Sequence, residues 1–159
     1  MRRIIFAAAA AAMAASLATT GAAAAAPITK TEHFSFISTS ITGNTFSAIA
    51  TGAFTAGGTA NLPSGKGTLK FPGGTIKVTN KAGRVKSSFD AKTCLATSVQ
   101  PGTFKVISGT GAYAGITGSG KYTAHFTEVA PTVAGKCSTK GNPVAVQAII
   151  SASGPVTLP

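Results

Sequence analysis

The side chains able to carry acid–base chemistry are few in this chain. Its 159 residues include two histidines, His33 and His125, and three carboxylates, Glu32, Asp90 and Glu128. General acid–base catalysis needs such groups to converge on a substrate, and a glycosidase needs two carboxylates facing one bond. The spacing of these five residues indicates no convergence. His125 lies out of phase with the apolar residues around it, and His33 is expected near the start of a strand, so both imidazoles are predicted to face solvent.

Metal, nucleophile and stacking motifs are also missing from the sequence. No C-x-x-C or H-x-x-x-H spacing occurs, and three acids are too few for a calcium site. No G-x-S-x-G turn accompanies the single aspartate, Asp90, which argues against a Ser-His-Asp triad. The chain has no tryptophan for stacking carbohydrate or bases. We therefore expect no cofactor, no metal and no specific nucleic-acid partner.

Cys94 and Cys137 are the only two cysteines. In an oxidising compartment an even pair predicts one disulfide. A catalytic thiol at Cys94 is the alternative interpretation. We favour the disulfide because two free thiols outside the cell would be exposed to oxidation.

The N-terminal segment has the three parts of an export signal. Arg2 and Arg3 form its positive region, residues 4–17 its apolar region, and residues 22–26 supply the small side chains that signal peptidase needs. A membrane anchor is the alternative, but the apolar stretch is shorter than the ~20 residues of a span and lacks a positive stop-transfer flank. We expect a signal peptide over residues 1–25, secretion to the extracellular space and one domain over residues 26–159.

The positive charge predicts attraction to anionic polymers. The formal net charge is +11 with only three acids, and such surfaces draw polyanions. Lysine predominates, however, and its ammonium lacks the planar fork with which arginine recognises phosphate. The lysines are also spread along the sequence without a run of five or six. We expect mainly solvated lysines and a weak, salt-screened contact with anionic polymers.

The elements that must position these side chains are predicted to be strands. Apolar residues recur with a period of two, and turn-forming glycine, proline and asparagine clusters interrupt them every eight to twelve residues or so. This spacing favours an antiparallel barrel or sandwich, with residues 144–151 as a closing strand. The residues expected to share an inward face are Phe34 and Phe36; Phe46, Ala48, Ala50 and Phe54; Leu69 and Phe71; Ile76 and Val78; Val85 and Phe89; Phe104 and Val106; and Tyr122, Ala124 and Phe126.

Residues 109–120, GTGAYAGITGSG, form the most distinctive segment. The spacing G-x-G-x-x-x-G differs from the nucleotide-binding fingerprint, and a strand is expected after it where a phosphate site needs a helix. We therefore expect an extended, sharply coiled ribbon that serves the barrel. Gly111 and Gly118 are predicted to occupy backbone positions that exclude a Cβ.

This segment resembles the barrel shared by allene oxide cyclases and plant dirigent proteins, which many small secreted bacterial proteins also resemble. The resemblance implies an eight-stranded antiparallel barrel, often oligomeric, whose apolar interior takes a lipid-like or aromatic ligand. It transfers no catalytic residue, because the acidic, amide and tyrosine groups of the cyclase pocket do not align with this chain. The matching residues are Phe104, Val106, Gly109, Thr110, Gly111, Tyr113, Gly115, Gly118 and Gly120, with residues 71–75 as a weaker echo.

These features predict a secreted, non-enzymatic barrel that binds a hydrophobic small molecule or an anionic surface and can form homo-oligomers. Two alternatives remain open. An isomerase or cyclase would use Tyr113, Tyr122 or a histidine as proton donor, and a polar residue pointing inward would favour it. An interaction or inhibitor protein would use its loops, and a large exposed apolar patch would favour that function.

Overall fold

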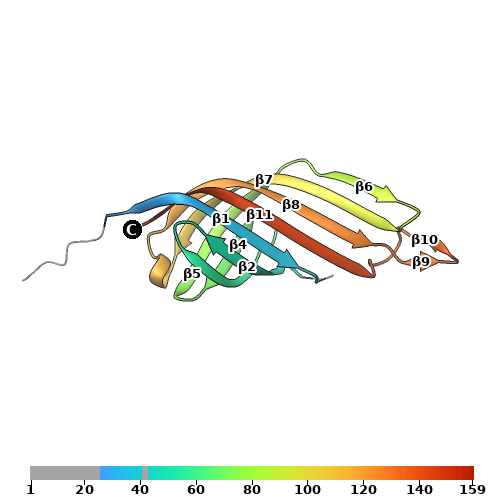
Figure 1. Cartoon of the computed structure of the whole chain (residues 1–159), viewed down its shortest axis with the longest axis horizontal. Coiled ribbons are helices and arrows are strands. Elements are labelled where there is room, and N and C mark those ends of the chain that lie inside the picture. The colour runs from blue at the N-terminus through green and yellow to red at the C-terminus, as the bar shows by residue number, and fades with distance from the viewer. Residues whose placement is uncertain (1–25, 41–42) are drawn as a thin grey trace, which may run out of the picture.

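The computed structural model describes residues 26–40 and 43–159 and shows an all-β fold (Figure 1). The predicted export signal, residues 1–25, lies outside the described residues. No helix in the described ranges is long and apolar enough to cross a membrane. In chain order the elements are β1 (Ile28–Ser38), β2 (Thr45–Thr51), β3 (Thr55–Asn61), β4 (Lys66–Phe71), β5 (Gly74–Ala82), β6 (Lys86–Asp90), β7 (Leu95–Gly109), the 3-10 helix η1 (Gly111–Tyr113), β8 (Thr117–Val129), β9 (Thr132–Val133), β10 (Lys136–Cys137) and β11 (Ala145–Leu158).

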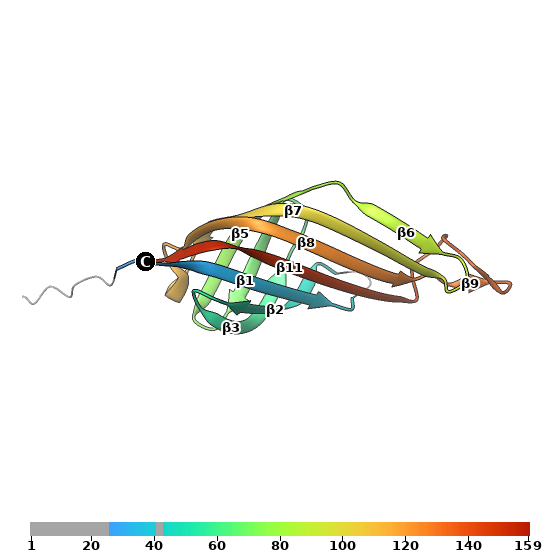
Figure 2. The same cartoon turned by 45° about the horizontal axis from the view of Figure 1, so that its top comes forward.

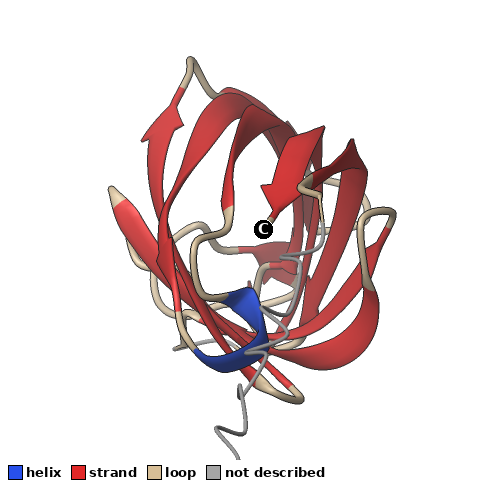
Figure 3. Ribbon diagram, turned by 90° about the vertical axis from the view of Figure 1, so that its left-hand side faces the viewer, coloured by secondary structure: helices blue, strands red, loops and turns tan. Residues whose placement is uncertain are grey.

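Eight of the strands close into an antiparallel barrel. The hydrogen-bonded order is β5-β4-β3-β2-β1-β11-β8-β7-β6, and a further pairing of β5 with β7 closes the ring. β11 lies between β1 and β8, so the last strand joins the first. Figure 3 views this ring of strands from the end that carries η1. The predicted antiparallel barrel of about eight strands is therefore confirmed.

The wall of the barrel extends far beyond the ring on one side. β7 has 15 residues, of which those from Gly102 onward pair with β5 while Leu95–Val99 pair with β6. We call this extension the overhang (Figures 1 and 2). It consists of β6, the first part of β7, the end of β8 and the start of β11. Val85 and Phe89 are predicted to share an inward face, but they are 46% and 42% exposed because β6 is an edge strand that pairs with β7 alone. That prediction is wrong.

Cys94 and Cys137 form a disulfide at the tip of the overhang. Cys94 directly precedes β7 and Cys137 lies in β10, with their Cα atoms 5.2 Å apart. The backbone carbonyl of Cys94 also accepts a hydrogen bond from the Ala130 N–H at 2.8 Å. The disulfide thus fastens the β9–β10 hairpin to the turn between β6 and β7.

The predicted alternation places the core correctly in the barrel strands. Large and small apolar residues alternate with exposed polar ones because successive side chains of a strand point to opposite faces. Phe54 differs from the prediction: β2 ends at Thr51, and Phe54 follows in a turn that contains Gly52 at φ 145°. Its ring still packs against Phe71, with 5.5 Å between centroids. The buried inward residues include Phe34, Phe36, Phe46, Ala48, Ala50, Leu69, Phe71, Ile76, Val78, Phe104, Val106 and Ala124.

The glycine segment closes one end of the barrel instead of running as an extended ribbon. Gly111 and Gly115 have φ values of 61° and 78°, which turn the chain into the short helix η1. The Ala112 N–H donates to the Gly73 carbonyl at 2.9 Å and fixes this turn on the β4–β5 hairpin. Buried Tyr113 packs at this end of the barrel against Phe54 and Phe71, and Figure 3 shows η1 at the rim of the ring of strands.

Candidate functional site

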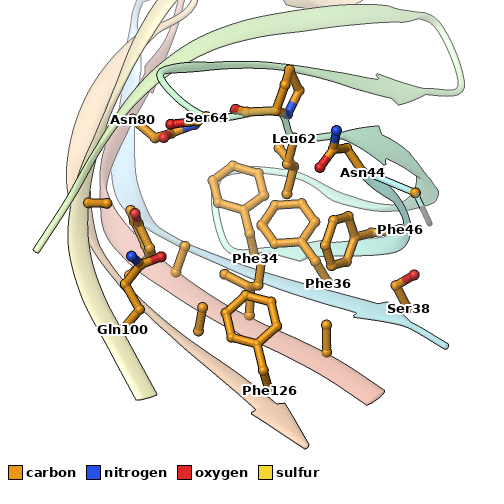
Figure 4. A pocket seen from close by; sticks show the side chains of 18 of the residues that line it. Phe34, Phe36, Ser38, Asn44, Phe46, Leu62, Ser64, Asn80, Gln100 and Phe126 are labelled. Carbon is orange, nitrogen blue, oxygen red and sulfur yellow. Dashed lines mark hydrogen bonds between the residues drawn. The ribbon is translucent and has the colours of Figure 1, made fainter. Parts of the chain in front are cut away.

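A cavity of about 510 Å³ occupies the barrel at the end opposite η1, and Figure 4 shows it from close by. Its volume lies within the range of roughly 300–1,000 Å³ typical of small-molecule sites. The rings of Phe34, Phe36, Phe46 and Phe126 gather in its interior. The remaining apolar lining is Leu62, Pro63, Leu69, Val78, Ala82, Phe104, Tyr122, Ala124, Val146, Ala148, Ile150 and Ala152.

Small residues opposite large ones leave this space open. On β1, Phe34 pairs with Ala50 of β2 and Ala152 of β11. Phe36 likewise lies opposite Ala48 on its β2 side. Alanine side chains on the flanking strands do not fill the volume that the pleat makes available between the phenylalanine rings. The sequence pattern that builds the inner face therefore also builds the cavity.

The mouth of the cavity is polar but nearly uncharged. Glu128 is the one charged side chain among the described residues that line the cavity. Asn80 stabilises the β3–β4 turn at the mouth: its side-chain amide donates to the Pro63 carbonyl at 3.3 Å, and its Oδ1 accepts the Gly65 N–H at 3.1 Å. Half-buried Gln100 lies where β7 passes from β6 to β5. The other polar lining residues are Ser38, Ser40, Asn44 and Ser64.

Aromatic rings separate the cavity from the closed end. Phe34 packs edge-on against Phe104 and Phe54, with centroid distances of 6.1 and 6.3 Å. Phe54 in turn contacts Phe71 and lies 4.9 Å from the ring of Tyr113. Edge-to-face aromatic pairs of this kind stabilise a core beyond the area that they bury. They form a floor between the cavity and the end of the barrel that carries η1.

Glu32 is buried beyond this floor. It is fully inaccessible to solvent, and its Oε2 accepts the N–H groups of Ala53 and Phe54 at 2.7 and 3.2 Å. Its Oε1 has no hydrogen-bond partner in the part of the chain that the structure describes. Burial raises the pKa of the Glu32 carboxyl, against the opposing effect of the two backbone N–H groups and of His33. The alternation of Phe34 and Phe36, continued back by one step, would have predicted this inward position.

The raised pKa of Glu32 predicts a pH-dependent stability. The folded protein binds the Glu32 proton more tightly than the unfolded chain does. The stabilisation that results is therefore full below the ordinary carboxyl pKa of 4.5, and it is lost as the pH rises through the folded pKa. We expect wild-type protein to resist urea better near pH 4.5 than near pH 7, and Glu32→Gln, uncharged at both, to show a smaller difference.

The titration of Asp90 does not contribute to this difference between pH 4.5 and pH 7. The N–H of Lys92 is the main cause that lowers the Asp90 pKa, so the stabilisation by Asp90 is lost only as the pH falls below about 3.8. An unchanged pH dependence in Glu32→Gln would show that other groups are responsible.

The predicted proton donors are separated by the fold. His33 and His125 are exposed on the outer wall. The Tyr113 hydroxyl donates to the Pro72 carbonyl at 3.1 Å, on the far side of the floor. Tyr122 lines the cavity, and burial raises the pKa of its phenol. Within residues 26–40 and 43–159, no three His, Cys, Asp or Glu side chains gather closely enough to hold a metal ion.

The glycines of the distinctive segment lie outside the cavity. Gly109 ends β7, and Gly111 and Gly115 form the turn at the closed end. Gly120 pairs with Phe104, and a Cβ there would lie 2.6 Å from the Phe104 ring. These residues therefore shape the barrel and leave room for its aromatic rings.

Comparison of the chain with family models, with curated proteins and with solved structures gave no match. The resemblance to allene oxide cyclases and dirigent proteins stays a prediction, and the cavity itself carries the functional argument.

Proposed function

We propose that this chain is a secreted binding protein that holds an apolar small molecule in the phenylalanine-lined cavity. The observation that carries the proposal is a wide apolar space, bounded at one end by aromatic rings and bordered at the other by hydroxyl and amide groups. Sites of this kind obtain affinity from apolar burial and orientation from a few polar groups. Export agrees with the Cys94–Cys137 disulfide, since such bonds persist in oxidising compartments.

The polar groups at the mouth favour a ligand with a neutral head. No cation lines the described part of the cavity, and Glu128 would repel an acid. The amides of Gln100 and Asn44 are suited to a hydroxyl or carbonyl oxygen. We therefore propose an elongated or aromatic apolar ligand that carries an alcohol, ketone or ester.

Binding without turnover is the simpler function for this cavity. The two imidazoles face outward, and the Tyr113 hydroxyl is already used within the fold. An isomerase or cyclase would depend on Tyr122, the predicted proton donor that lines the cavity, because inward-pointing Glu32 does not line it. A ligand recovered unchanged after incubation with wild-type protein would support binding alone.

The neutral fluorescent probe N-phenyl-1-naphthylamine tests the cavity directly. Wild-type protein should enhance its emission saturably. Ala148 is buried in the cavity wall, whereas Ala145 of the same strand is exposed. Ala148→Phe should weaken probe binding roughly tenfold or more by filling the space, since a factor of ten corresponds to about 1.4 kcal/mol. Ala145→Phe, the matched control, should bind like wild type.

Circular dichroism and thermal melting establish that both variants fold. As a second measure, Phe126→Ala enlarges the cavity and removes apolar contact, so it should weaken probe binding without overpacking the wall. Equal binding by all variants, or emission that never saturates, would contradict the proposal.

A further inference from the structure

Six lysines lie on the outer face of four neighbouring barrel strands. They alternate with inward residues: Lys70 stands between Leu69 and Phe71, and Lys105 between Phe104 and Val106. All six are exposed. We call this surface the lysine face, and its lysines are Lys66 and Lys70 on β4, Lys77 and Lys81 on β5, Lys105 on β7 and Lys121 on β8.

The strand register surrounds these lysines with hydroxyl groups. Lys77 pairs with Thr68 on one side and Ser108 on the other. Lys105 pairs in the same way with Thr79 and Ser119. The neighbouring lysines stand at the diagonal positions, about 7–8 Å away. The remaining pairs are Lys66 with Thr79, Lys70 with Thr75 and Thr59, Lys81 with Thr103, and Lys121 with Thr103 and Ser153.

No carboxylate balances this charge on the lysine face. Glu32 is buried inside the barrel, and Asp90 and Glu128 belong to the overhang. The outer faces of β2 and β3, in contrast, carry no charged residue at all. Solubility alone requires dispersed charge, whereas here repulsion between like charges is concentrated on one part of the wall. The concentration indicates a polyanionic partner.

We propose that the lysine face binds a flexible, base-free phosphate polymer. Lysine ammonium groups attract phosphate as point charges, and threonine and serine hydroxyls donate to the remaining oxygens. The face carries no aromatic residue on which bases would stack. Its strands belong to a closed, curved wall, and Ile107 is its one large exposed apolar side chain among the described residues. A flexible chain follows such a surface more completely than a flat bilayer does.

Two triple variants with the same change in net charge test this inference. Lys66→Gln, Lys77→Gln and Lys105→Gln remove three charges from the lysine face. Lys92→Gln, Lys136→Gln and Lys140→Gln, the control, remove three from the overhang tip and its adjoining loop. Binding of fluorescently labelled inorganic polyphosphate is followed by anisotropy between about 50 and 200 mM salt, where phosphate contacts weaken with a slope set by their number.

We expect the face triple to lose roughly tenfold or more in affinity and its salt slope to fall by about two. The control triple should stay within a few-fold of wild type, and Lys→Arg at the three face positions should retain binding. Probe binding in the cavity should be unchanged in every variant, because these side chains point away from it. An equal loss of affinity in the two Gln triple variants would show that only net charge matters, and it would overturn the proposal. Tighter binding of a single-stranded oligonucleotide or of anionic phospholipid vesicles than of polyphosphate would also overturn the proposal.

Discussion

Replacing both Cys94 and Cys137 with alanine should lower the free energy of unfolding by about 2–4 kcal/mol. The disulfide joins residues 43 positions apart, and a cross-link of that span restricts the unfolded chain far more than the folded one. The chain has no tryptophan to report unfolding by fluorescence. Urea denaturation followed by far-ultraviolet circular dichroism therefore measures the loss of stability. Mass spectrometry of the purified protein should show two hydrogens fewer than in the reduced form.

Wild-type protein with its disulfide reduced is the control. It should unfold at the same urea concentration as the double alanine variant. The bond lies at the tip of the overhang, so binding of the neutral probe in the cavity should persist below the transition. Two free thiols in the oxidised preparation, or a double variant as stable as wild type, would contradict the prediction.

Valine at Gly111 or at Gly118 should each cost about 1–3 kcal/mol of stability. Gly111 has a φ of 61°, and a Cβ there would collide with the Gly73 carbonyl oxygen. At Gly118 a Cβ would lie 2.7 Å from the Pro155 carbonyl oxygen, so the paired strand would have to shift. Thermal melting and urea denaturation should both detect the loss.

Gly57→Val is the matched control for these glycines. A Cβ at this exposed position of β3 has no atom within 4 Å, and valine favours strands. This variant should be as stable as wild type or slightly more so. If Gly111→Val kept full stability while ligand binding was lost, the segment would be part of the binding site and not a structural closure.

The inward faces of the barrel could be predicted from the sequence because a strand reports its burial every second residue. Phe34 and Phe36, like Tyr122 and Ala124, follow that rule and line the interior. The helix η1 could not be predicted from it. There, positive φ at glycine and a hydrogen bond to the distant β4–β5 hairpin replace alternation, and both depend on tertiary contacts.

The cavity and the lysine face depend on which strands are neighbours. Alternation predicts that Lys77 and Lys105 point outward. These two positions lie far apart in the chain, and the β5–β7 pairing brings them onto one surface. The β5 pairing covers only Gly102–Gly109 of β7, whereas Leu95–Val99 pair with β6 in the overhang. The sequence therefore predicts the faces of the strands, while closure of the barrel determines what those faces form together.

The pairing of β1 with β11 also has a consequence for the time course of folding. Ile28 of β1 lies opposite Leu158 of β11, so this pair can form only after 130 further residues (158 − 28) have been synthesised. At synthesis rates of about 5–20 residues per second, that delay is roughly 7–26 seconds. During it β1 has an unpaired edge, and non-local pairings of this kind also form slowly once both partners exist. The ring of strands therefore cannot close until β11, the last strand, has been synthesised.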